Sequence, residues 1–122
     1  MNDHVARISI IVAVALVGTG PASAHAHLKS ETPAIDATTA SPDAVTLQFT
    51  EGLEPKFSGA TVTGPTGSAV PTGPGRLAPE DHARLIVPLS GKLAPGTYRV
   101  DWHAVAVDGH KTSGSYRFTV AP

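Results

Sequence analysis

Apolar and polar residues alternate along several short stretches of this chain, which is the pattern of half-buried β-strands. The stretches are Ala44–Thr50, Ser58–Thr63, Leu85–Leu89, Tyr98–Trp102 and Ser115–Val120. After residue 24 no segment keeps a helical period over three turns. About seven short strands with turn signals between them predict an all-β fold, a two-sheet antiparallel sandwich. Pro88 predicts an edge position for its strand, because proline cannot donate a ladder hydrogen bond.

Two connections add detail to this sandwich. Residues 64–79 are rich in Gly, Pro and Thr, and we expect a hairpin followed by a surface loop there. The run Leu93–Tyr98 places a Pro-Gly turn directly before a tyrosine. This arrangement resembles the tyrosine corner of immunoglobulin-like sandwiches, in which the hydroxyl bonds back to an upstream backbone group.

The first 24 residues have the features of a signal peptide rather than of a folded element. Arg7 gives a weakly positive start, Ile8–Val17 is almost wholly apolar, and Ala22–Ala24 has the small residues that signal peptidase accepts. About ten apolar residues make a helix of about 15 Å, half of a membrane's hydrocarbon thickness. We therefore expect cleavage between Ala24 and His25, export from the cytoplasm, and one mature domain over residues 25–122.

Composition excludes several kinds of function. The chain has no cysteine, so thiolate metal sites, thiol catalysis and disulfides are excluded. Its formal net charge of −1 provides no field that would attract nucleic acid or an anionic membrane surface. Twelve glycines and eleven prolines disfavour helices, which agrees with the alternating pattern.

Histidines provide the candidate chemistry. An N-terminal His25 could chelate a metal through both its α-amine and Nδ1, and the amine loses its proton near pH 8. Asp108 and His110 add an oxygen and a nitrogen, and on a strand their spacing would place both side chains on one face. Three nitrogens and one oxygen in a tetragonal arrangement favour Cu(II) over zinc. The sequence therefore predicts one Cu(II) site formed by His25, Asp108 and His110.

Other residues leave alternatives open. His27 in third position would let the terminus bind Cu(II) alone, through the amine, two deprotonated amides and the imidazole. Amide deprotonation weakens binding at neutral pH, so we expect His27 to be an additional or exchanging ligand. His82 and His103 are interpreted as surface residues. Glu51 could be a carboxylate near the metal or a solvated turn residue.

Together these residues resemble the CopC family of periplasmic copper-binding proteins, over essentially the whole mature chain. The matching segments are His25, Leu28–Ser30, Thr32–Pro33, Leu47–Leu53, Phe57–Ala60, Leu93–Trp102, Val107–His110 and Ser113–Gly114. The resemblance implies a Greek-key β-sandwich and a Cu(II) site at His25, Asp108 and His110, with His27 able to join. It also implies a tryptophan near the metal, here Trp102.

One departure from the family bears on the metal. Some members also hold Cu(I) in a methionine-rich loop, whereas the only methionine here is Met1, which is lost on export. Since Cu(I) prefers soft sulfur ligands, we expect no Cu(I) site.

We therefore expect a monomeric copper carrier or buffer in copper homeostasis or resistance. The family suggests an inner-membrane transporter resembling CopD as its partner. Two alternatives stay open: a copper monooxygenase that also uses an N-terminal histidine, and a metal-free immunoglobulin-like assembly module.

Overall fold

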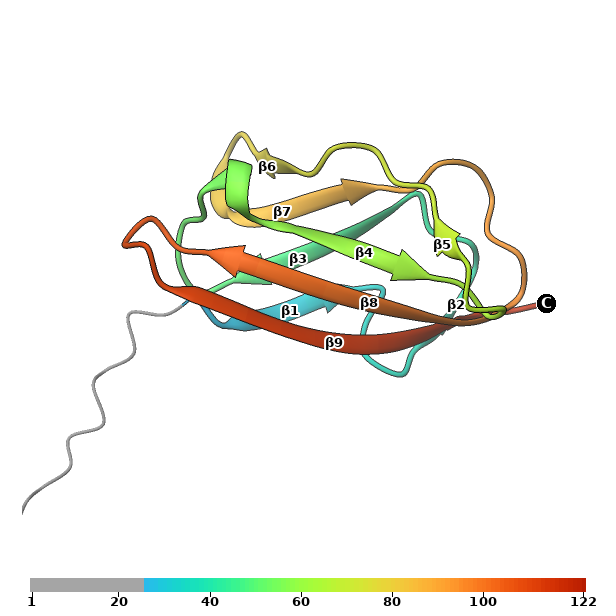
Figure 1. The fold of residues 1–122 in the computed structure, drawn as a ribbon. Helices are drawn as coiled ribbons and strands as arrows, with labels where there is room; N and C mark the ends of the chain where they lie inside the picture. The colour runs from blue at the N-terminus through green and yellow to red at the C-terminus, as the bar shows by residue number, and fades with distance from the viewer. Residues whose placement is uncertain (1–25) are drawn as a thin grey trace, which may run out of the picture.

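A computed structural model describes residues 26–122, which form two β-sheets packed face to face (Figure 1). The strands are β1 (Leu28–Thr32), β2 (Thr38–Thr39), β3 (Ala44–Phe49), β4 (Gly59–Thr63), β5 (Ala69–Val70), β6 (Arg76–Ala78), β7 (Asp81–Pro88), β8 (Gly96–Val105) and β9 (Lys111–Val120). A short 3-10 helix, η1 (Pro55–Phe57), precedes β4. No helix in this described part of the chain is long and apolar enough to cross a membrane.

The sheets have the strand orders β1-β3-β7-β6 and β2-β9-β8-β4-β5. All pairs are antiparallel except β2 with β9. The chain passes from one sheet to the other at every connection except β4–β5, β6–β7 and β8–β9. The predicted fold class, an immunoglobulin-like Greek-key β-sandwich, is confirmed. Nine strands are found in residues 26–122 rather than about seven, because strands of two or three residues are too short to show alternation.

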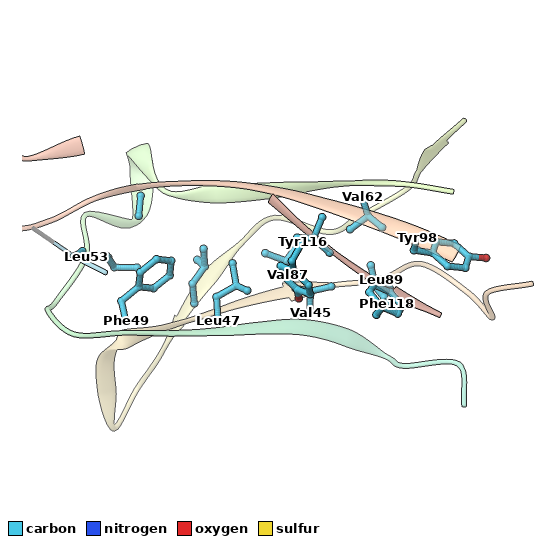
Figure 2. Packing of buried hydrophobic residues seen from close by; sticks show 14 of the residues in the cluster. Val45, Leu47, Phe49, Leu53, Val62, Val87, Leu89, Tyr98, Tyr116 and Phe118 are labelled. Atoms are coloured by element: carbon cyan, nitrogen blue, oxygen red, sulfur yellow. The ribbon is translucent and has the colours of Figure 1, made fainter. Parts of the chain in front are cut away.

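The alternating positions form the core between the sheets. Val45, Leu47 and Phe49 on β3 are at most 1% exposed, and Val100 and Phe118 meet them from the other sheet with no exposed surface. Figure 2 shows the labelled side chains, Val45, Leu47, Phe49 and Phe118 among them, pointing into the space between the two layers. Burying a side chain of this size contributes about 1.5–3 kcal/mol. The period-2 pattern therefore fixes which face of each strand the sandwich buries.

The edge position predicted for the strand with Pro88 was wrong. This strand, β7, lies between β3 and β6 in the middle of its sheet. Pro88 is tolerated because it is the last residue of β7, beyond the pairing with β6, which begins at Ile86. Its carbonyl still accepts a hydrogen bond from the amide of Gly73, at 2.9 Å.

The predicted tyrosine corner is present. The Tyr98 hydroxyl donates to the carbonyl oxygen of Ala94 at 2.6 Å, and the tyrosine is 3% exposed. Its ring stacks on Phe118 with centroids 5.5 Å apart. The bond ties the turn before β8 to the core.

Two tyrosine substitutions test how much this bond contributes. We expect Tyr98→Phe to lower the free energy of unfolding by about 1 kcal/mol, because the mutation removes a satisfied hydrogen bond. Tyr116→Phe is the matched control: the Tyr116 hydroxyl is buried and has no hydrogen-bond partner among the described residues. Removing a desolvated, unbonded hydroxyl should be neutral or slightly stabilising. Urea unfolding followed by circular dichroism measures both, and equal losses would contradict this assignment.

Candidate metal centre

Three segments distant in sequence meet at one end of the sandwich. They are residues 26–27 before β1, the loop 50–54 after β3, and the hairpin 106–110 between β8 and β9. In Figure 1 the hairpin, η1 and the start of β1 lie at the end opposite the C-terminus. Every predicted ligand within residues 26–122 belongs to one of these segments. His25 and the predicted cleavage site lie outside the described residues.

The N-terminal segment is anchored by two threonines. Ala26 is completely buried, and its carbonyl oxygen accepts a hydrogen bond from the Thr112 hydroxyl at 2.8 Å. The His27 amide donates to the Thr50 hydroxyl at 3.0 Å, and the Thr50 amide donates to the His27 carbonyl at 2.9 Å. The chain thus enters the fold against the first residues of β9.

The β8–β9 hairpin has a tight turn. The amide of Gly109 donates to the carbonyl of Ala106 at 2.8 Å, and the Ala106 amide donates to the His110 carbonyl at 2.9 Å. Gly109 has a φ of 91°, a left-handed conformation that glycine adopts without a Cβ clash. Asp108 and His110 lie in this turn between β8 and β9, so the shared face that their spacing would give on a strand does not apply to them.

Asp108 and His110 nevertheless lie together, because the aspartate side chain folds back onto the turn. Its Oδ1 accepts a hydrogen bond from the His110 amide at 3.0 Å, and its Oδ2 lies 3.0 Å from His110 Nδ1. The first contact is the Asx-turn geometry that aspartate commonly forms two residues ahead. The carboxylate oxygen Oδ2 and the imidazole nitrogen Nδ1, both of them potential donor atoms, therefore face each other at the turn.

The loop after β3 binds the β8–β9 hairpin through backbone hydrogen bonds. The Val107 amide donates to the Gly52 carbonyl at 3.1 Å, and the Glu54 amide donates to the Val105 carbonyl at 2.8 Å. Because Thr50 in the same loop binds His27, one loop positions both the N-terminal segment and the hairpin. Glu51 is half-buried within it.

Trp102 packs close to this end of the core. Its ring meets Phe49 edge-on, with centroids 5.3 Å apart. Trp102 pairs across the sheet with Gly114, where a Cβ atom would lie only 2.7 Å from the indole ring. The indole therefore lies over a glycine on the neighbouring strand.

The other predicted site residues are placed as follows. His27 is exposed beside the loop, and His82 and His103 are exposed on β7 and β8, as expected for surface residues. His82 is the second residue of β7. Among residues 26–122, no three His, Asp or Glu side chains are close enough together to hold a metal ion. Of the predicted ligands within residues 26–122, the structure brings only Asp108 and His110 into contact with each other.

Sequence reasoning missed the two anchoring threonines. Thr50 and Thr112 act through bonds to residues 23 and 86 positions away. Thr50 directly follows β3 and Thr112 lies within β9, and a threonine in either place carries no local signal of such a partner. Only the folded chain could reveal these contacts.

The fold and this site together define a structural class of protein, namely a small β-sandwich with an Asp–His pair and an anchored N-terminal segment at one end. Residues 28–121 match the sequence model of the CopC domain, so the chain belongs to the CopC family. It is 48% identical over 115 residues to Protein YobA of Escherichia coli K12, covering 93% of each chain. It is 43% identical over 107 residues to Copper resistance protein C of Escherichia coli, covering 81% of this chain and 83% of that one.

A solved structure agrees with the family. The fold superposes on that of PcoC, described as a methionine-rich copper resistance protein from Escherichia coli, with a TM-score of 0.71 and 38% identity. The match covers 80% of this chain and 99% of that one. The predicted membership of the CopC family is thereby confirmed.

Proposed function

We propose that the mature chain binds one Cu(II) ion through His25, Asp108 and His110, and that it carries or buffers copper in the periplasm. The observation that carries this proposal is the hydrogen bond that the Thr112 hydroxyl donates to the Ala26 carbonyl. Thr112 lies two residues after His110, so this bond holds the N-terminal segment beside the β8–β9 hairpin. Consecutive Cα atoms are about 3.8 Å apart, so cleavage after Ala24 would create the new α-amine one residue from this anchor. The Asp108–His110 pair belongs to the same end of the fold.

The proposed donors suit copper. The amine and imidazole of His25, with the imidazole of His110, supply nitrogen, and Asp108 supplies a carboxylate oxygen. Such a set favours Cu(II) in a tetragonal geometry, and Cu(II) also leads the affinity order of the divalent metals. Two of the similar proteins are named for copper resistance, which supports copper as the metal.

The anchoring of His27 favours the site completed by the fold over binding by the N-terminal tripeptide alone. In the tripeptide mode the amide nitrogens of Ala26 and His27 would lose their protons and bind the metal. The His27 amide instead donates to Thr50, so that mode would cost this hydrogen bond as well as the deprotonation. We propose that the His27 side chain is an additional or exchanging ligand.

The oxidation state follows from the absence of thioether sulfur. Among the similar proteins, PcoC is described as methionine-rich, whereas Met1 is the only methionine of this chain and lies in the predicted signal peptide. Thioethers are the soft ligands that Cu(I) prefers. We therefore propose that the protein holds Cu(II) without a Cu(I) site.

A carrier role agrees with this donor set better than catalysis does. Asp108 would occupy an equatorial position that oxygen chemistry needs open. The copper-receiving partner in this proposal is an inner-membrane transporter resembling CopD. The related copper resistance proteins also make a metal-free assembly module a weaker alternative.

Replacing single histidines tests the proposal. We expect His110→Ala to lower the Cu(II) affinity by a factor of at least about 10, because a direct nitrogen donor is lost. His82→Ala removes another exposed histidine, on β7, and should leave the affinity unchanged. Competition against a chromophoric chelator at pH 7 measures both values. If His110→Ala has no effect while His27→Ala abolishes binding, the tripeptide mode is the true site.

A further inference from the structure

A basic groove adjoins the proposed copper site. It has a volume of about 810 Å³ and lies between η1 and the outward side of β8 and β9. Its lining includes Lys56, Phe57, His103, Val105, Lys111 and Thr112, and no acidic residue of the described chain, residues 26–122, contributes to it. Phe57 is 62% exposed, and Lys56 and Lys111 are also exposed. The groove therefore offers an aromatic surface flanked by two positive charges.

The groove and the proposed copper site are built in part from the same residues and neighbouring backbone. Thr112 lines the groove and also holds the Ala26 carbonyl. Lys111 directly follows His110, so its backbone continues from the Asp108–His110 turn into the groove. Val105, on the β8 side of the groove, accepts a hydrogen bond from Glu54 in the loop that supports the hairpin. A molecule seated in the groove would lie beside the proposed metal ligands.

We propose that this groove receives an acidic segment with apolar side chains, contributed by the protein that exchanges copper with this chain. The inference rests on the proposed function for the identity of that partner. The chain as a whole has a net charge of −1, so the two lysines form a local positive patch rather than part of a general field. Carboxylates of the partner would meet Lys56 and Lys111, and an apolar side chain would pack on Phe57.

The shape of the surface favours a peptide over a membrane. A concave groove can enclose an extended segment, whereas interfacial membrane binding uses an amphipathic helix with a broad apolar face, and the groove is formed mainly by two strands. Charge complementarity of this kind raises the rate of encounter and fixes the orientation of the partner. The groove would thus bring the partner to the open end of the sandwich where copper is held.

The test uses the metal-free mature chain, residues 25–122, labelled with ¹⁵N. The probe is a capped peptide of alternating glutamate and leucine, with a lysine–leucine peptide as its matched control. We expect the acidic peptide to shift amide resonances at residues 56–57, 103–105 and 111–113, and the basic peptide to shift none. The double variant Lys56→Glu/Lys111→Glu should weaken binding by about tenfold or more, because it reverses both contacts.

Lys92→Glu provides the charge control, because Lys92 is exposed and lies outside the groove lining. It should leave peptide binding unchanged. The proposal is overturned by the absence of shifts, by equal binding of both peptides, or by shifts that persist in the double variant. Binding to vesicles containing anionic phosphatidylglycerol without binding to the peptide would identify a membrane site instead. Since no copper is present, failure here and failure of the Cu(II) assignment are distinguishable.

Discussion

A mature chain with one extra glycine before His25 is expected to bind Cu(II) at least about 100-fold more weakly than the chain that begins at His25. The extra residue converts the His25 amine into an amide, which no longer binds metal without deprotonation. The chelate ring between amine and Nδ1 is lost, although every side chain stays in place. Losing a direct ligand should cost more than the 10- to 100-fold typical of residues that only orient ligands. Chelator competition at pH 7 gives both affinities.

The control for this experiment is a mature chain with the same glycine added after Pro122. The C-terminus lies at the end of the sandwich opposite the proposed site (Figure 1), so the affinity should not change. Circular dichroism should show the same fold in both extended chains. Equal Cu(II) affinities in all three chains would mean that the amine is not a ligand and that the proposed site is wrong.

The second large effect is expected at Gly114, which lies beneath Trp102. Gly114→Ala should lower the free energy of unfolding by about 2 kcal/mol, because the new methyl would lie 2.7 Å from the indole Cζ2 and 2.9 Å from Cε2. The indole is rigid and packs against Phe49, so it cannot move without losing that contact. Urea unfolding measures the loss. A red shift of the fluorescence of Trp102, the only tryptophan, would report its displacement.

Gly73→Ala is the matched control for this substitution. A methyl there would meet the Pro88 side chain at 3.4 Å, an ordinary contact. We expect stability to stay within about 0.5 kcal/mol of the original or to rise, because alanine restricts the unfolded chain more than glycine does. A similar loss in both variants would show that glycine is needed at Gly114 for some reason other than space for the indole.

Alternation along the chain was sufficient to predict the long strands and the side that each buries. The Val45, Leu47 and Phe49 positions are buried as predicted, since period 2 is a property of the strand itself. The pairing of β7 between two neighbours was not predictable. A proline at the last position of a strand has the same local pattern as a proline on an edge strand, and only the register of β6 separates the two cases.

The candidate site was predictable in its residue types but not in its geometry. Asp108 and His110 were selected for their spacing, and they do lie together. The cause is an Asx turn around Gly109, not a strand, and a sequence that contains Asp-Gly fits either conformation. The anchoring of Ala26 by Thr112 depends on a contact across 86 residues. No local pattern encodes such a contact, so its position had to come from the folded chain.

Mass spectrometry and electron paramagnetic resonance of the exported protein with one equivalent of Cu(II) test the central claim most directly. We expect the mass of a chain that begins at His25 and one Cu(II) spectrum with hyperfine structure from three nitrogens. In His110→Ala the spectrum should lose one of these nitrogen couplings. A mature chain that begins elsewhere, or a spectrum that is identical in His110→Ala, would contradict the claim that the new N-terminus and the β8–β9 hairpin together bind copper.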